Sequence, residues 1–323
     1  MVEHRQLLYC RALAAHGHFG RAAESLGITQ SSLTRSLQGL ERSMGVKLFD
    51  RKRSRVEPTV FGQILLRHGE RILLEGEDLV RELQLLQGLD TGRLTVTSAL
   101  YPSEMSVHRA IGRMVGRHPK LRCRAQLRDW RGAIVDVLER QVDIAVAEIS
   151  EAEDDSRLVT KTVGEHPLTF FCRPAHPLAG RKNLSLEEAF SYPWASTRGP
   201  ARMTKYFPKS FGAAGWLDEV HGEFVSAIQV DTVATAKQVV AQSDALTPGP
   251  PVLFHQELAS GELAHLEFNR PWFRLHYGFI YLQDRTLSPA AEAFIREVEC
   301  VEAELACGSR STESEGGSPD RGS

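Results

Sequence analysis

The sequence lacks an apolar run long enough to cross a lipid bilayer. A membrane-spanning helix needs about 18 apolar residues or more, and no stretch of the 323-residue chain reaches that length. The first residues include Glu3, His4 and Arg5 ahead of only a short apolar stretch, which does not match a secretory signal. We therefore expect a cytoplasmic protein that has no membrane partner.

Cysteine is scarce, and its spacing matches neither a disulfide framework nor a zinc site. The five cysteines are odd in number and widely scattered, without a CxxC pair: Cys10, Cys123, Cys172, Cys300 and Cys307. Buried or idle thiols are favoured over a disulfide, a metal site or a redox switch. We expect no metal and no cofactor.

Signatures of catalysis are also missing. The chain contains no GxSxG, HExxH, P-loop or GxGxxG motif. Twelve histidines and many serines would permit a catalytic pair on paper, but none lies in a recognisable setting. We expect a protein that is not an enzyme.

The first 58 residues have the pattern of a helix-turn-helix followed by a hairpin. Apolar spacing predicts short helices over residues 6–16 and 20–26. A third helix follows Thr29, which suits an N-cap, and ends at Gly45. Short apolar segments at 47–49 and 56–58 flank a basic tip, which is typical of a small wing.

Net charge is nearly absent from the whole chain but not from this segment. The chain has 39 Lys and Arg against 41 Asp and Glu, yet residues 1–58 carry +5 and the remainder carries -7. The densest basic run is Arg51, Lys52, Arg53 and Arg55. A charge run is often only a solvated face, but its position directly after a helix-turn-helix favours contact with phosphates or with the minor groove.

A long helix is predicted over residues 59–89, where Pro is absent. One stripe along it alternates by three and four residues, the pattern of a helix–helix seam. Glycine costs about 1 kcal/mol relative to alanine inside a helix. We expect its glycines to allow close approach of the same helix of a second subunit, the alternative being a surface helix that tolerates glycine. The stripe includes Gly62, Leu65, Gly69, Ile72, Gly76 and Leu79.

From residue 92 the pattern alternates between strands and helices. Strands are predicted at 94–97, 121–127 and 143–146, with helices between them, which indicates a parallel sheet covered by helices. A second region of this kind covers residues 162–266, and a returning strand at 279–282 precedes a closing helix at 288–305. Residues 304–323 are expected to form a disordered tail, because 308–323 lack an apolar anchor.

The sequence strongly resembles the LysR-type transcriptional regulators over residues 1 to about 303. Residues 19–41 read FGRAAESLGITQSSLTRSLQGLE, and 45–51 read GVKLFDR. Further landmarks follow in family order: Thr59-x-x-Gly62, GRLTV at 92–96, VDIAV at 142–146, HPLA at 176–179 and LSPAAxxFI at 287–295. Each string is weak alone, but their common order makes a chance match improbable.

The resemblance implies an α/β protein with an amino-terminal winged helix-turn-helix (1–58), a linker dimerisation helix (59–89) and an effector-binding domain (90–303) similar to periplasmic solute-binding proteins. Its lobe I would comprise 92–161 and 268–303, and its lobe II 162–267. The implied function is sequence-specific, DNA-binding regulation of transcription, controlled by a small-molecule effector between the lobes. The implied partners are a double-stranded operator, a second copy in a homodimer or homotetramer, and RNA polymerase.

The start of the third helix carries the expected DNA readers, because the N-terminal residues of such a helix reach base edges in the major groove. Gln30 suits adenine, and Arg35 suits guanine or a phosphate. Thr29 is assigned mainly to capping. The full set is Gln30, Ser31, Ser32, Thr34, Arg35 and Ser36, together with Arg51, Lys52 and Arg53 of the basic run.

Candidate effector residues follow the predicted strands, because ligands of such folds bind beyond the carboxyl ends of strands. Hydroxyl, aromatic and guanidinium groups there suit a small molecule that bears a carboxylate. Alternatively, Tyr101 and Trp130 are core residues and Arg198 faces solvent. The candidates are Ser98, Leu100, Tyr101, Ser103, Trp130, Thr197, Arg198, Asp231 and Thr232, with Asp129 and Ser196 beside them.

Two other functions remain open. A solute-binding protein would need export, for which the sequence shows no signal. A thiol-based sensor would need a reactive cysteine pair, whereas the second lobe holds only Cys172. Both are less favoured than a ligand-controlled regulator.

Overall fold

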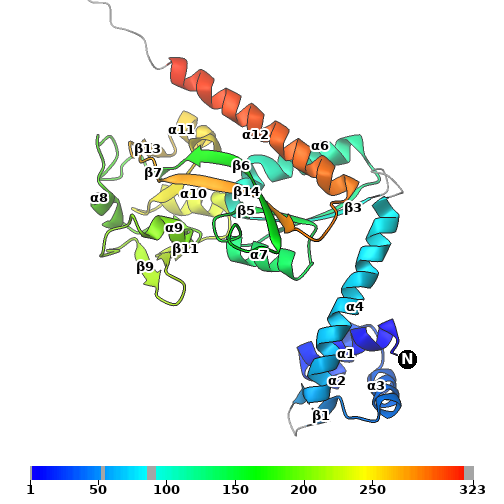
Figure 1. The fold of residues 1–323 in the computed structure, drawn as a ribbon. Helices are drawn as coiled ribbons and strands as arrows, with labels where there is room; N and C mark the ends of the chain where they lie inside the picture. Colours follow the sequence, from blue (N-terminus) through cyan, green and yellow to red (C-terminus); the bar gives the residue numbers. More distant parts are fainter. Residues whose placement is uncertain (1, 52–54, 86–91, 316–323) are drawn as a thin grey trace, which may run out of the picture. The chain divides into compact units, whose positions relative to one another are not determined.

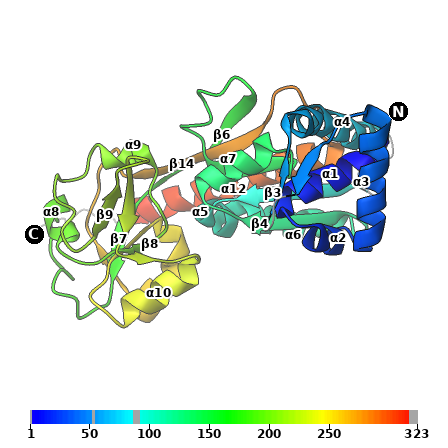
Figure 2. The same cartoon turned by 90° about the horizontal axis from the view of Figure 1, so that it is seen from below.

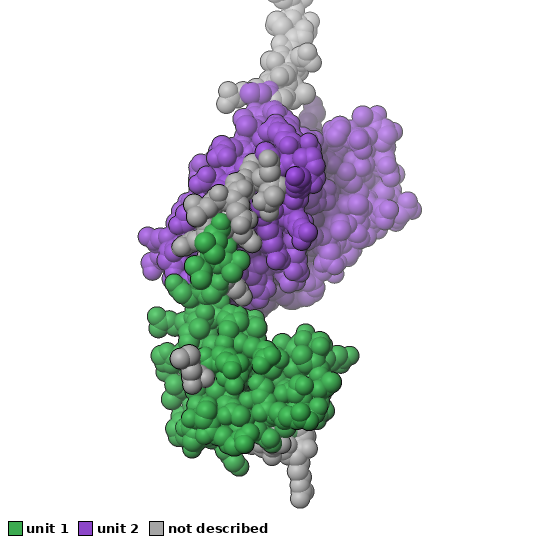
Figure 3. All heavy atoms as spheres, turned by 90° about the vertical axis from the view of Figure 1, so that its right-hand side faces the viewer, with its two compact units in different colours: residues 1–86 green, residues 87–323 purple. Residues whose placement is uncertain are grey.

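The computed structural model describes residues 2–51, 55–85 and 92–315. The chain divides into two compact units, Met1–Leu86 and Gln87–Ser323 (Figure 3). Within the described ranges, no helix is long and apolar enough to cross a membrane.

The first unit contains the predicted helix-turn-helix (Figure 1). Gly17 and Gly45 end the first and third helices with φ of +60° and +70°, a conformation that favours glycine. The Thr29 hydroxyl accepts a hydrogen bond from the Ser32 N–H at 3.2 Å and caps the third helix. The helices are α1 (His4–His16), α2 (Phe19–Ser25) and α3 (Gln30–Met44).

The wing is an antiparallel pair of β1 (Phe49–Arg51) and β2 (Val56–Pro58). The Glu41 carboxylate accepts hydrogen bonds from the N–H of Leu48 at 2.8 Å and of Phe49 at 3.3 Å, which ties the wing to α3. Lys52 and Arg53, expected to contact DNA, lie outside the described residues, and the side chain of Arg51 is not described either.

Helix α4 covers Val60–Leu85, with Thr59 as its cap: the Thr59 hydroxyl accepts the Gly62 N–H at 3.1 Å. Residues 86–89 of the predicted helix lie outside the described part. The glycines of α4 face their own unit: a Cβ at Gly62 would lie 2.0 Å from the Leu48 carbonyl oxygen, and one at Gly69 would lie 2.9 Å from the Leu7 side chain.

The close approach at Gly62 and Gly69 is therefore made within their own unit, to α1 and to the residues at the ends of the wing. Gly76 likewise faces His4 of α1, and Leu65 packs against the core of the unit. The expectation that Gly62 and Gly69 form the dimer seam is corrected accordingly, whereas for Leu65 and Gly76, which are half-buried, it stays a prediction. Its error is physical: sequence spacing defines a helix face but not the element that covers it.

Another face of α4 remains apolar and exposed. The exposed stripe of α4 comprises side chains that are 45–59% exposed, and it retains two residues of the predicted seam. Its members are Phe61, Ile64, Ile72, Leu79 and Leu83.

The second unit has two lobes. Lobe I is built on a five-stranded sheet of order β4-β3-β5-β14-β6. The first three strands are parallel, as predicted, but β14 and β6 are antiparallel to their neighbours, so the sheet is mixed. The strands are β3 (Arg93–Ser98), β4 (Arg122–Leu127), β5 (Ile144–Glu148), β6 (Leu158–Pro167) and β14 (Arg274–Leu282).

Helices lie on both sides of this sheet (Figure 1). Alternating side chains of its strands divide between the two helical layers. Ile144 and Val146 pack in one core cluster with the helices α6 and α12, whereas Ala145 and Ala147 pack against α7 in another. The helices of this lobe are α5 (Leu100–Pro102), η2 (Ser103–Val107), α6 (His108–Arg117), α7 (Trp130–Leu138) and α12 (Pro289–Glu315).

The first crossing between the lobes comes later in the chain than the expected boundary at 161/162. Strand β6 stays in the sheet of lobe I up to Pro167, which pairs with Arg274. The Leu168 N–H then donates to the Phe273 carbonyl at 2.9 Å, and Phe268 and Phe273 pack in the core of the second lobe. Both crossings therefore lie about six residues beyond the expected boundaries.

Lobe II is held together by an aromatic cluster around β7. Figure 2 shows β7 in this lobe together with β8, β9 and α10. Its three-stranded sheet has the order β12-β7-β13, and its short pairs are β11 with β8 and β10 with β9. The strands are β7 (Thr169–Cys172), β8 (Ala195–Ser196), β9 (Gly215–Asp218), β10 (Glu223–Ser226), β11 (Ile228–Gln229), β12 (Thr247–Gly249) and β13 (Ala264–Leu266). The helices are α8 (Leu186–Phe190), α9 (Ala201–Thr204), α10 (Val233–Ala241), η3 (Pro251–Leu253) and α11 (His255–Ser260).

The closing helix α12 extends to Glu315, so the expectation of a disordered tail is wrong for residues 304–315. Leu305 packs against the core of lobe I, and the Glu304 carboxylate lies 2.7 Å from the Arg113 guanidinium of α6. These contacts anchor a part of the helix that sequence composition alone assigned to the tail. Residues 316–323 lie outside the described part.

Candidate functional site

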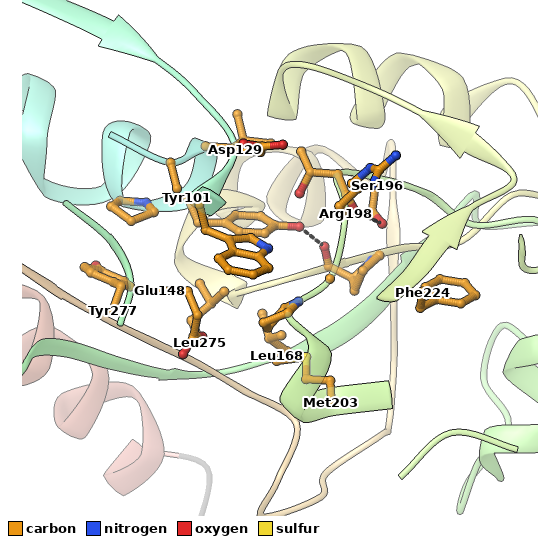
Figure 4. A pocket seen from close by; sticks show the side chains of 18 of the residues that line it. Tyr101, Asp129, Glu148, Leu168, Ser196, Arg198, Met203, Phe224, Leu275 and Tyr277 are labelled. Atoms are coloured by element: carbon orange, nitrogen blue, oxygen red, sulfur yellow. Dashed lines mark hydrogen bonds between the residues drawn. The ribbon is translucent and has the colours of Figure 1, made fainter. Parts of the chain in front are cut away.

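A cavity of about 750 Å³ lies between the two lobes (Figure 4). Its volume falls in the range of about 300–1,000 Å³ that is typical of small-molecule sites. Lobe I contributes residues at or just beyond the carboxyl ends of β3, β4 and β5, as the fold predicts. These are Leu100, Tyr101, Asp129, Trp130 and Glu148; lobe II adds Ser196, Thr197, Arg198, Gln229 and Asp231 to the polar part of the lining.

Six of the nine predicted effector residues line this cavity: Leu100, Tyr101, Trp130, Thr197, Arg198 and Asp231. The other three do not. The Ser103 hydroxyl donates to the Leu100 carbonyl at 2.6 Å, and the Thr232 hydroxyl accepts from the Thr235 N–H at 3.0 Å as the cap of α10. Ser98 is buried at the end of β3. Local backbone bonding, rather than a ligand, accounts for Ser103 and Thr232.

Tyr101 and Trp130 line the cavity, and each also makes a contact that stabilises the fold. The Tyr101 hydroxyl donates to the Pro248 carbonyl at 2.6 Å and so links the two lobes. Burial raises the pKa of Tyr101, which keeps the phenol protonated at neutral pH. Trp130 packs in the core cluster under α7, with the Arg131 guanidinium 4.9 Å from its ring.

A carboxylate that the sequence did not single out ends β5. Glu148 forms a two-point ion pair with Arg202 of α9, with distances of 3.1 Å to Nε and 2.7 Å to Nη2. Arg202 also donates to the Arg274 carbonyl at 2.8 Å. The pair joins the lobes and neutralises Glu148, so its charge is not free to bind a cationic ligand.

Arg198 is held at the rim of the cavity by two carboxylates. Its Nη1 lies 3.1 Å from Asp218 and 3.4 Å from Glu223. Glu223 is fully buried, and its other oxygen lies 2.7 Å from Nε of Arg131 in lobe I. A guanidinium fixed in this way can orient a ligand group that accepts hydrogen bonds.

The remaining wall of the cavity is apolar and was not anticipated. We name it the inner wall; it is formed by Leu168, Trp194, Met203, Phe207, Phe224 and Phe273. All six pack in the aromatic cluster of lobe II. Because they do not follow strand ends, the rule that located the polar residues could not locate them, and only their apolar character was visible in the sequence.

The start of α3 exposes four of its six predicted readers. Gln30, Ser31, Ser32 and Arg35 are exposed, whereas Thr34 and Ser36 are half-buried. The Thr34 hydroxyl donates to the Gln30 carbonyl at 2.8 Å, which favours a structural role for this side chain. The opposite side of the helix is buried through Leu33, Leu37 and Leu40. This face therefore offers amide, hydroxyl and guanidinium groups to a partner.

The environment of the two fully buried thiols, Cys10 and Cys172, does not favour redox chemistry. Burial raises the pKa of Cys10 to about 12 and that of Cys172 to about 11, and the thiol rather than the reactive thiolate is then present at neutral pH. Cys300 and Cys307 are exposed on α12. Among the described residues, no group of three or more His, Cys, Asp or Glu side chains is placed to hold a metal ion.

Comparison with known proteins places both units in one family. Residues 4–63 match the bacterial regulatory helix-turn-helix protein, lysR family, and residues 87–301 match the LysR substrate binding domain. The SDS degradation transcriptional activation protein of a Pseudomonas species is 36% identical over 298 residues, covering 91% of this chain and 94% of the relative. A probable RuBisCO transcriptional regulator of Synechocystis is 26% identical over 295 residues, covering 91% of this chain and 84% of the relative.

Solved structures share the fold. CbnR in complex with its target DNA has a TM-score of 0.56 at 18% identity, covering 93% of this chain and 100% of CbnR. An OxyR mutant from Corynebacterium glutamicum, bound to H2O2, has a TM-score of 0.54 at 20% identity, covering 96% of both chains. At such identities the likeness concerns the fold alone. With both units matched by models of one family and with a relative at 36% identity, the chain belongs to the LysR family of transcriptional regulators.

Proposed function

We propose that this LysR-type regulator reads its operator with Gln30 and Arg35 of α3, associates through the exposed stripe of α4, and responds to an amphiphilic small molecule in the cavity between its lobes. The observation that carries the last point is the division of this cavity into a polar rim and an apolar inner wall.

The proposed DNA contacts follow from the chemistry of the exposed side chains. The amide of Gln30 can form two hydrogen bonds with adenine, and the guanidinium of Arg35 can form two with guanine. Ser31 and Ser32 carry hydroxyls suited to bases or phosphates. Since Thr29 caps α3, the readers are attached to a fixed helix end.

The proposed association surface is the exposed stripe of α4. The stripe places five large apolar side chains on one face of one helix, and leaving them exposed to water is costly. Pairing of two copies of α4 would bury them and would set two reader helices on one duplex, as a dyad-symmetric operator requires.

Ligand control is proposed to act through the placement of the lobes. The pairs Arg131–Glu223 and Arg202–Glu148 cross between the lobes beside the cavity, so a ligand that fills the cavity favours one arrangement of the lobes over others. Binding, not catalysis, is then the action of the site. Because chromosomal DNA is the target, we place the protein in the cytoplasm.

An amphiphilic effector is also supported by the relative from Pseudomonas, which is named for SDS degradation. A thiol switch has less support, because Cys172 is buried and its pKa is raised.

The experiment that tests the function is an electrophoretic mobility shift with the full chain and DNA from upstream of its own gene. We expect a shifted band that resists an excess of unrelated duplex. If unlabelled duplex of unrelated sequence competes as well as unlabelled duplex of the upstream sequence, the proposal is wrong.

A further inference from the structure

We propose that the inner wall is a slot for a single unbranched alkyl chain, and that the polar rim at Thr197 and Arg198 holds a head group that accepts hydrogen bonds. The inference rests on the proposed function, because it names the class of ligand that the same cavity takes.

The inner wall has almost nothing to offer a polar ligand. Its residues carry one strong hydrogen-bond donor, the indole N–H of Trp194, which already donates to the Ala189 carbonyl at 2.9 Å. Leu168, Trp194, Met203, Phe224 and Phe273 are each at most 6% exposed. A polar group placed among them would lose its bonds to water without replacement, whereas methylene groups would not.

The packing of the rings favours an alkyl chain over another aromatic ring. Phe224 meets Trp194 edge to face with ring centres 5.1 Å apart, and it meets Phe207 at 5.2 Å in the same way. These rings already satisfy one another's preferred geometry. Met203, unbranched and flexible, closes the wall from α9 and can adjust to a slender chain. Figure 4 shows Leu168 and Met203 on this side of the cavity.

The head group is defined by the opposite side of the cavity, where Ser196, Arg198 and Asp129 lie together in Figure 4. The two ion pairs of Arg198 use Nη1, and a guanidinium has five N–H donors, so further donors are present for a ligand. The Thr197 hydroxyl adds another. Asp129 and Asp231 are exposed on the same rim. Their carboxylates repel negative charge, so the head group of a ligand should carry little of it. A sulfate, a carboxylate or a hydroxyl meets this description.

A tail slot makes a quantitative prediction. Burial of one methylene group contributes enough to raise affinity about fourfold. Affinity should therefore rise by this factor with each added methylene and reach a plateau once the slot is full. A ligand recognised by its head group alone would show no such dependence.

The test is a titration of the full chain with hexyl, octyl and decyl sulfates and the matching primary alcohols, below their micellar concentrations, followed by calorimetry. We expect about fourfold tighter binding per methylene in both series. An alkyltrimethylammonium series, whose head group accepts no hydrogen bond, should bind at least tenfold more weakly. Equal binding of the ammonium series, or affinity that is independent of length, would overturn the proposal.

Two variants locate the slot. Met203→Trp should fill it and abolish the gain per methylene, while Phe224→Leu should lengthen it and move the plateau to a longer chain. The matched control is Phe190→Leu, because Phe190 packs in the same aromatic cluster but does not line the cavity. It should leave the length dependence unchanged. If Met203→Trp does not fold, the shift of the plateau in Phe224→Leu still decides, and an unmoved plateau there overturns the assignment.

The mobility shift separates the two proposals. Operator binding without length dependence would refute the slot and leave the regulatory function standing. Length dependence without operator binding would refute the function and leave the slot standing.

Discussion

The Arg131 Nε lies 2.7 Å from the Glu223 carboxylate, an ion pair that joins α7 of lobe I to β10 of lobe II. Glu223 is fully buried and also lies 3.4 Å from Arg198 at the rim of the cavity. A buried carboxylate that loses a partner is costly because its desolvation is no longer offset. The stability of the two-lobed unit and the position of Arg198 at the rim of the cavity therefore both depend on Glu223.

This relationship predicts the effect of Arg131→Met. We expect the free energy of unfolding in urea to fall by about 1–3 kcal/mol, less than for a fully enclosed pair because Arg131 is partly exposed. Arg157→Met is the control: Arg157 pairs with Asp155 on the surface, where water screens the pair, and should change stability far less than Arg131→Met. Additive effects of Arg131→Met and Glu223→Gln in a double-mutant cycle would show that the pair is not coupled.

The reader assignment predicts that Arg35→Ala weakens operator binding about tenfold to a hundredfold, as expected for one lost two-point contact to a base. Arg42 is the matched control, because it lies in the last turn of the same helix and bonds to the Gln38 carbonyl. Fluorescence anisotropy at one fixed salt concentration makes the comparison. Equal losses in Arg35→Ala and Arg42→Ala would indicate general electrostatics instead of base reading.

The exposed stripe of α4 predicts that Leu79→Asp raises the dissociation constant of self-association by at least about thirtyfold, since a large apolar contact is replaced by a charge. Gln63→Asp, an exposed position away from the stripe on the same helix, should leave it unchanged. Light scattering over a concentration series measures both. An unchanged mass for Leu79→Asp would exclude this face as the interface.

The environment of His176 predicts that the free energy of unfolding falls at acidic pH. It is buried, its Nδ1 accepts from the Leu178 N–H at 3.0 Å, and its Nε2 lies 3.2 Å from the Asp244 carbonyl. Burial lowers the pKa of His176, so the folded chain resists a proton that the unfolded chain takes up near pH 6.5. Its contribution is present above that pH and is lost as the pH falls below it.

Replacing this side chain by His176→Gln should therefore reduce the slope of unfolding free energy between about pH 6.5 and 5.5. Its effect at pH 7.5 reports packing alone and serves as the reference. Urea titrations at the three pH values give the slope. Parallel profiles for the two proteins would show that another group controls this range.

Local signals accounted for the helix-turn-helix and for half of the cavity. Thr29, Gly17 and Gly45 mark helix ends through bonds and angles that involve only near neighbours. The polar rim followed from one topological rule, because residues after parallel strands meet at one edge.

Features formed by residues that are distant in the chain could not be predicted from the sequence. The inner wall brings Leu168 and Phe273 together only because the chain crosses twice between the lobes. The glycines of α4 have the spacing of a seam, but spacing cannot tell whether Leu7 of the same unit or another subunit covers them. The part of α12 around Glu304 is anchored by Arg113, almost two hundred residues away in the chain.

The proposed action of this chain is to bind a specific DNA sequence under the control of a ligand in its cavity. The most direct measurement is the fluorescence anisotropy of a labelled duplex from upstream of its own gene, with the full chain, in the presence and absence of decyl sulfate. We predict affinity at least about a thousandfold above that for a scrambled duplex, and a change with decyl sulfate that Met203→Trp abolishes. Equal affinity for both duplexes, with no response to decyl sulfate, would show that the chain is not a sequence-specific regulator controlled through this cavity.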